Sequence, residues 1–135
     1  MGLTRKTIVL LALGVAFAAA WSSVRAGEQD VVVLRTFDAE GNDYFTTLWW
    51  VEDPAGFVWI RANRPDRRWL AHVRESDSLR LGRGARTRSY AAKVFDDART
   101  RQIVAPWFRA KYGLADRWRE WSTPGETVPV RLRAL

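Results

Sequence analysis

The chain has 135 residues, which is enough for one domain with a hydrophobic core, and its eight tryptophans and 47% hydrophobic content argue against extensive disorder. It contains no cysteine and one histidine, which excludes a disulfide framework and a metal or haem site built from several Cys or His ligands. Three of its 22 basic residues lie in residues 1–26, which contain no acid; the other 19 face 15 acidic residues, and this near balance argues against a dedicated nucleic-acid binder.

The N-terminal segment, residues 1–26, reads MGLTRKTIVLLALGVAFAAAWSSVRA. Arg5 and Lys6 precede an apolar stretch from Thr7 to Trp21, and small residues follow it. This pattern predicts an apolar helix that is either a cleaved signal peptide or an uncleaved membrane anchor. Because basic residues before such a helix hold the N-terminus in the cytoplasm, the rest of the chain is expected to be exported across the cytoplasmic membrane, and to be anchored there or secreted to the cell envelope.

Three strands are expected next, at residues 31–36, 44–51 and 57–62, because these runs are β-branched or aromatic and are separated by Gly-containing turns. Their short connections predict an antiparallel meander. Both faces of the second run are largely apolar, so both should be covered by other parts of the protein.

A short helix is expected from about Asp66 to Ser76, with a buried stripe of Trp69, Leu70 and Val73. Two further strands and a longer late helix follow. Asp96 and Asp97 suit the start of that helix, Gly113 suits its C-cap, and Pro106 is expected to kink or divide it. The expected later elements are strands at 78–82 and 88–95, the helix at 96–113, and a closing strand at 127–135.

Strands, a short helix, more strands and a late helix indicate an α+β fold, with residues 27–135 forming one antiparallel β-barrel domain. A sheet that is apolar on both faces implies a filled barrel interior. The outside of such a barrel must then be covered by helices or by a second subunit.

Four arginines gather where the third strand passes into the short helix: Arg61, Arg64, Arg67 and Arg68. A helix N-terminus carries unpaired N–H groups and a partial positive charge, and arginine matches phosphate oxygens, so one interpretation is an anion site. The other is a solvated loop whose charges are paired internally. Asp66 as the N-cap would occupy the helix amides, whereas Asn63 as the cap would leave the site free.

Other candidate residues are interpreted as structural. His72 is expected to be a partly exposed helix residue rather than an acid or base, and no nucleophile motif or paired-carboxylate arrangement accompanies it. The aromatics Trp49, Trp50 and Trp59 suit core or dimer contacts, or stacking on the ring of a bound ligand. The arginines of RLGRGARTRS, residues 80–89, form either a solvated hairpin turn or a contact with anionic lipid.

The segments VVVLRT, TTLWWV and RANRPDRRWLAHV resemble, in this order, the first strand, the second strand and the strand-to-helix passage of the split β-barrel superfamily of flavin and deazaflavin proteins. That superfamily includes pyridoxamine-phosphate-oxidase-like proteins and deazaflavin-dependent nitroreductases. FRAKYG is similar to the end of a helix in some members, so the resemblance covers roughly residues 30 to 113.

The resemblance implies a split barrel that binds FMN or a deazaflavin coenzyme in a groove on its outer wall, at the interface of a homodimer. The ring would lie along the second and third strands, and the phosphate would lie near the passage into the short helix. By position, the ring would be flanked by Thr47, Leu48 and Trp49, with Trp69 packed beneath the phosphate. The phosphate would be surrounded by Arg61, Asn63, Arg64, Arg67 and Arg68.

Two functions therefore remain open. The first is a flavin- or deazaflavin-dependent oxidoreductase that acts on a small molecule, in which the cofactor supplies the chemistry and no catalytic dyad is needed. The second is a non-catalytic, exported or membrane-anchored split-barrel module that binds a ligand or none. Two observations favour the second: the expected export signal, and the acidic turn FDAEGND where deazaflavin-dependent relatives carry a basic one.

Overall fold

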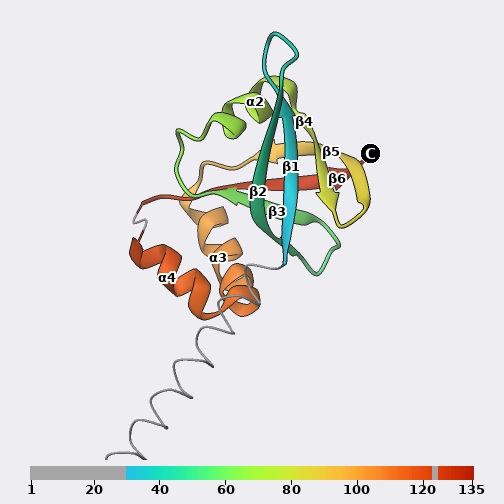
Figure 1. The fold of residues 1–135 in the computed structure, drawn as a ribbon. Coiled ribbons are helices and arrows are strands. Elements are labelled where there is room, and N and C mark those ends of the chain that lie inside the picture. Colours follow the sequence, from blue (N-terminus) through green and yellow to red (C-terminus); the bar gives the residue numbers. More distant parts are fainter. Residues whose placement is uncertain (1–29, 123–124) are drawn as a thin grey trace, which may run out of the picture.

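The computed structural model describes residues 30–122 and 125–135 and shows a six-stranded barrel with three helices in those ranges (Figure 1). The strands are β1 (Val31–Phe37), β2 (Asp43–Glu52), β3 (Val58–Ala62), β4 (Ser78–Arg83), β5 (Arg86–Val94) and β6 (Val128–Ala134). The helices are α2 (Arg68–Ser76), α3 (Ala98–Tyr112) and α4 (Leu114–Ser122). The expected signal or anchor, residues 1–26, lies outside the described ranges, and no helix within them is long and apolar enough to cross a membrane.

All strand pairs are antiparallel, and the sheet closes in the order β1-β2-β3-β6-β5-β4. The α+β barrel predicted from the sequence is therefore confirmed. Closure removes the exposed strand edges that an open sheet would leave. The bounds of the observed strands differ from the expected ones by no more than two residues. The glycine turns that separated the expected strands are present, since Gly41, Gly56 and Gly84 all adopt positive φ between strands.

The barrel interior is filled by alternate side chains of each strand. Leu34 of β1 is opposite Thr46 of β2 and Leu81 of β4, so these residues share the inner face. Leu34, Ile60 of β3 and Val130 of β6 are completely buried. The interior is therefore a packed core.

Helix α2 closes one end of the barrel, and its buried stripe is the one expected: Trp69, Leu70 and Val73 join the interior core. His72 is also buried, so the expectation of a partly exposed histidine was wrong. Its Nδ1 lies 2.9 Å from Thr36 Oγ1, and that contact satisfies a ring nitrogen inside the protein.

Helix α3 covers part of the outer wall, where Val51 and Trp59 pack against Val104, Phe108 and Tyr112. Figure 1 shows α3 and α4 together on this side of the barrel, away from α2. The expected caps of α3 are confirmed. Asp97 accepts a hydrogen bond from the Thr100 amide at the start, and Gly113 follows the end.

Pro106 does not divide α3, which is one helix over all 15 of its residues. The proline removes one helical hydrogen bond, but it lies on the exposed side. Val104 and Phe108, which flank it in sequence, are buried against the barrel and hold the helix in place.

Candidate functional site

Strands β2 and β3 pair over only three residues each, and their separation creates a hollow. The last pair is Trp50 with Ile60; beyond it, β2 continues beside β1 alone, and β3 continues beside β6. A cavity of about 350 Å³ lies there, and we call it the split pocket. It is lined by Tyr44, Thr46, Thr47, Leu48, Arg61, Asn63, Arg67, Arg68 and Trp69.

The split pocket gathers most of the predicted site residues, from three separate elements. Thr47 and Leu48 belong to β2, Arg61 and Asn63 to the end of β3 and the loop after it, and the remaining three to the start of α2. Those three are Arg67, Arg68 and Trp69. Two predicted residues, Trp49 and Arg64, do not line it.

Trp49 faces the outer wall, where its ring stacks on that of Tyr112 at 4.4 Å between centroids and 7° between planes. Arg64 is exposed, and its Nε lies 3.3 Å from Asp66 Oδ1 in a local ion pair. Trp49 therefore packs under helix α3, and Arg64 is paired in the loop, as the alternative interpretation of the arginine cluster had it.

Arg61 forms part of the pocket wall, but its guanidinium is already paired. It is buried, its NH2 group donates to the Asp116 carboxylate, and its Cζ lies 4.0 Å from the ring centroid of Phe108. Burial lowers the pKa of Arg61 to about 10, so the side chain is charged at neutral pH and forms a true ion pair. Its primary contacts are with α3 and α4.

Arg67 and Arg68 have no acidic partner in the part of the chain that the structure describes. Arg68 NH1 lies 3.4 Å from the Tyr44 hydroxyl, and its Cζ is 5.5 Å from the Tyr44 ring centroid. Both side chains line the split pocket. Two guanidinium charges therefore stand beside the pocket without a carboxylate to neutralise them.

The N-terminus of α2 opens at the same place. Arg67 is its N-cap residue, no side chain caps the helix, and no acidic residue lies in its first turn. Asp66 is exposed and Asn63 lines the pocket, so neither residue serves as the cap considered from the sequence. Uncapped helix amides, beside two guanidiniums that lack an acidic partner among the described residues, form a donor set that suits a phosphate group.

Tyr44 and Thr46 complete the pocket and were not foreseen as site residues. Their positions follow from the pleat of β2, which turns alternate side chains to the inner face: both are opposite inner-facing residues of β1, Thr36 and Leu34. The Tyr44 ring also lies 4.7 Å from the His72 ring, which links the pocket to the buried Thr36–His72 contact. The alternation was visible in the sequence, but the separation of β2 from β3 was not.

No protein-family model and no curated protein matches the chain. Solved structures do match it in fold. A structure titled as a domain-swapped dimer has a TM-score of 0.62 at 14% identity, over 78% of this chain and 81% of that one. An F420-H2 dependent reductase has a TM-score of 0.58 at 14% identity, over 77% and 94% of the two chains.

A pyridoxamine 5'-phosphate oxidase-like protein from Listeria innocua has a TM-score of 0.55 at 9% identity, over 87% of this chain and 91% of that one. Identities this low establish a common fold and no shared activity. The resemblance noticed in the sequence is thereby confirmed at the level of fold: the chain shares its antiparallel barrel fold with these solved structures.

Proposed function

We propose that the protein is a flavin- or deazaflavin-dependent oxidoreductase acting on a small molecule, and that the split pocket holds the phosphate end of the cofactor. The single observation that carries this proposal is the pairing of Arg67 and Arg68, which lack acidic partners among the described residues, with the uncapped start of α2. The fold similarity to an F420-H2 dependent reductase and a pyridoxamine 5'-phosphate oxidase-like protein supports it.

Different residues of the split pocket would contact different parts of such a cofactor. Arg67 and Arg68 bind phosphate oxygens, and charge-assisted hydrogen bonds of this kind contribute about 1.5–3 kcal/mol each. Thr46 and Thr47 supply hydroxyl groups, and Leu48 supplies an apolar wall. A bound flavin or deazaflavin supplies hydride or electron transfer, so the protein needs only to position it against a substrate such as a quinone or nitro compound.

The test is a titration of the full-length chain with FMN and, in parallel, with a deazaflavin coenzyme, followed by visible absorption and melting temperature. FMN at 100 times its Kd should stabilise the fold by about 2.7 kcal/mol. The double variant R67Q/R68Q should bind at least about tenfold more weakly, because each lost charge-assisted bond exceeds the roughly 1.4 kcal/mol that corresponds to a factor of ten.

The matched control is Arg64→Gln, which removes an arginine from the same loop but outside the pocket. It should leave the affinity unchanged. Equal binding by wild type and R67Q/R68Q would refute the site. A chain that binds neither cofactor would instead support the second function, a non-catalytic split-barrel module.

The protein is further proposed to act as a homodimer through the outer face of the β1–β2 hairpin. Val33, Phe37 and Phe45 are exposed there, the last by 65%. Phe45 and the pocket residue Thr47 point to the same face of β2, so a partner subunit on this face would lie beside the split pocket. The structural neighbour titled as a domain-swapped dimer supports a dimeric state but does not indicate which face would form the interface.

Sedimentation of Phe45→Glu tests the dimer. The substitution should convert a dimer into a monomer, whereas Ile103→Glu, at an exposed apolar position on α3, should not. A wild-type chain that sediments as a monomer at all concentrations would contradict the proposal. Export and membrane attachment through residues 1–26 also remain proposals, which cell fractionation of the full-length chain can test.

A further inference from the structure

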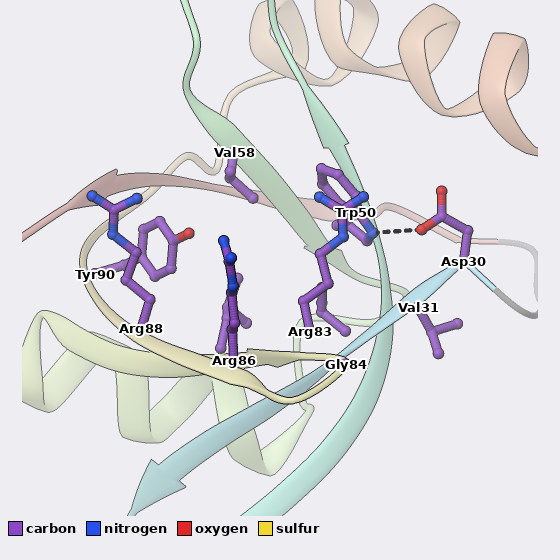
Figure 2. Close-up of a pocket in the computed structure, with 11 residues that line it drawn as sticks. Asp30, Val31, Trp50, Val58, Arg83, Gly84, Arg86, Arg88 and Tyr90 are labelled. Carbon is purple, nitrogen blue, oxygen red and sulfur yellow. Dashed lines mark hydrogen bonds between the residues drawn. The ribbon is translucent and has the colours of Figure 1, made fainter.

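We propose that the end of the barrel opposite α2 is a second binding site, for an amphipathic anion with an apolar body and one carboxylate or phosphate head. A cavity of about 660 Å³ lies there, between the start of β1 and the β4–β5 hairpin. We call it the mouth pocket (Figure 2). This site is independent of the split pocket and does not rest on the proposed cofactor.

The two ends of the barrel are closed differently. Near Thr36 of β1, helix α2 plugs the interior with Trp69, Leu70 and Val73. At the other end of the same strand, near Val31, none of the described helices lines the cavity. Cavities at the mouths of β-barrels are common ligand sites, and their usual volumes span roughly 300–1,000 Å³.

The inner part of the mouth pocket is apolar. Val32 and Leu81 are buried members of the interior core, and Val58 and Trp50 line the cavity beside them. These side chains offer a hydrocarbon or aromatic group a surface that excludes water.

Three arginines surround this apolar part, and they occupy inner-face positions of the barrel wall. Arg83 pairs with Arg86, and Arg88 pairs with Leu81, whose side chain is in the core. In Figure 2, Arg83, Arg86 and Arg88 all extend from the hairpin toward the strand that carries Val58. All three side chains are exposed, so an anion can reach their guanidiniums from solvent.

The three guanidinium groups have no carboxylate at ion-pair distance in the described part of the chain. The acidic residue that lines the pocket, Asp30, is bound to Lys111 Nζ at 3.0 Å and to Trp50 Nε1 at 3.1 Å. The ion-pair partner of Asp30 is therefore Lys111 and not one of the three arginines.

Two of the arginines are also held in place by aromatic rings. Arg83 Cζ lies 4.1 Å from the Trp50 ring centroid, and Arg88 Cζ lies 6.0 Å from that of Tyr90. Their remaining N–H groups can donate to a planar anion, which guanidinium binds with two parallel hydrogen bonds. An anion would also relieve the mutual repulsion of the three charges.

The test uses the full-length chain in phosphatidylcholine nanodiscs and measures octanoate binding by calorimetry and by the indole N–H resonance of Trp50. Octanol and octylammonium have the same chain without the negative charge, and inorganic phosphate has the charge without the chain. Each should bind at least about tenfold more weakly than octanoate. Equal binding of octanol, or of phosphate alone, would overturn the amphipathic assignment.

Variants identify the site. R83Q/R86Q/R88Q should lose at least about tenfold in octanoate affinity, whereas Arg80→Gln, on the same hairpin but outside the pocket, should bind as wild type does. Arg86→Glu places a carboxylate among the other arginines, so it should abolish binding while raising the melting temperature. Unchanged binding in the triple variant would overturn the proposal, and a folded Arg86→Glu protein that still binds octanoate would do the same.

A final pair of measurements distinguishes the source of the anion. Octanoate affinity that falls when phosphatidylglycerol replaces phosphatidylcholine in the nanodisc would identify an anionic lipid headgroup as the occupant. Affinity that stays constant would identify a free small amphiphile. Tighter binding of a single-stranded oligonucleotide than of octanoate, lost in R83Q/R86Q/R88Q, would overturn the proposal in favour of a nucleic-acid surface.

Discussion

Two regions of the barrel wall differ in whether their polar side chains are paired within the protein. Where α3 and α4 cover it, polar atoms are paired with one another: Arg61 binds Asp116, and the Tyr112 hydroxyl bonds the main chain of Trp50. Where β2 leaves β3, Arg67 and Arg68 line a hollow and form no ion pair with any acid among the described residues. Within the arginine-rich stretch 61–68, Arg61 therefore stabilises the fold, whereas Arg67 and Arg68 remain available to a ligand.

The largest effect that can test this contrast is the loss of Asp116. Its carboxylate is completely buried, and Asp116→Ala leaves the Arg61 guanidinium charged without this partner. Removal of one member of a buried ion pair costs about 3–5 kcal/mol. Urea unfolding measures the loss, and the double variant R61M/D116L should recover much of it. A cost below about 1 kcal/mol would show that the covered wall does not depend on this pair.

The next effect concerns Tyr112. Its hydroxyl accepts from the Trp50 amide at 2.9 Å and lies 2.8 Å from the Asp30 carbonyl oxygen, to which it can donate. Tyr112→Phe keeps the ring that stacks on Trp49 but leaves a buried amide without its partner, which costs about 1–3 kcal/mol. Tyr44→Phe, in the split pocket, is the comparison and should cost less, because Tyr44 is only partly buried. Equal losses of unfolding free energy in Tyr112→Phe and Tyr44→Phe would contradict the difference between the covered wall and the split pocket.

The same tyrosine gives the covered wall a dependence on alkaline pH. Burial raises the pKa of Tyr112 to about 12 from the ordinary value of 10.0. The unfolded chain loses this proton first, so the stabilisation is complete below pH 10 and is lost as pH rises through 12, by at most about 1.4 kcal/mol per pH unit. Unfolding of wild type and Tyr112→Phe across this window isolates the contribution, and parallel pH profiles would contradict it.

The smallest expected effect on stability comes from substitutions in the split pocket. R67Q/R68Q should change the free energy of unfolding by no more than about 0.5 kcal/mol, because both residues are exposed and neither forms an ion pair with a described residue. The comparison with Asp116→Ala is made in one urea series. A loss above about 2 kcal/mol would mean that these arginines serve the fold and not a ligand.

Much of the fold could be predicted because local patterns and tertiary packing agree. β-branched and aromatic runs with glycine turns gave the strands, and Asp97 and Gly113 gave the ends of α3. Helix α4 was missed, since it begins at Leu114 directly after Gly113 and its buried anchor is an aspartate. Its partner, Arg61, is 55 residues away in sequence, and no local pattern signals such a pairing.

The parts of the candidate site that are formed by consecutive residues could be predicted from the sequence. The parts that depend on contacts between distant segments could not. Arg67, Arg68 and Trp69 lie together because a strand leads directly into a helix. Trp49 and Thr47 both point outward from β2, yet only Trp49 lies beneath α3, which comes much later in the chain. The mouth pocket arises from the pairing of Arg83 with Arg86 and of Leu81 with Arg88, and that register was not assigned from the sequence.

The most direct test of the central claim is a crystal structure of the full-length chain with FMN. We expect the phosphate to lie within hydrogen-bonding distance of the Arg67 and Arg68 guanidiniums and of the first amides of α2. A phosphate bound instead among Arg83, Arg86 and Arg88, with the split pocket holding no part of the cofactor, would contradict the proposed function.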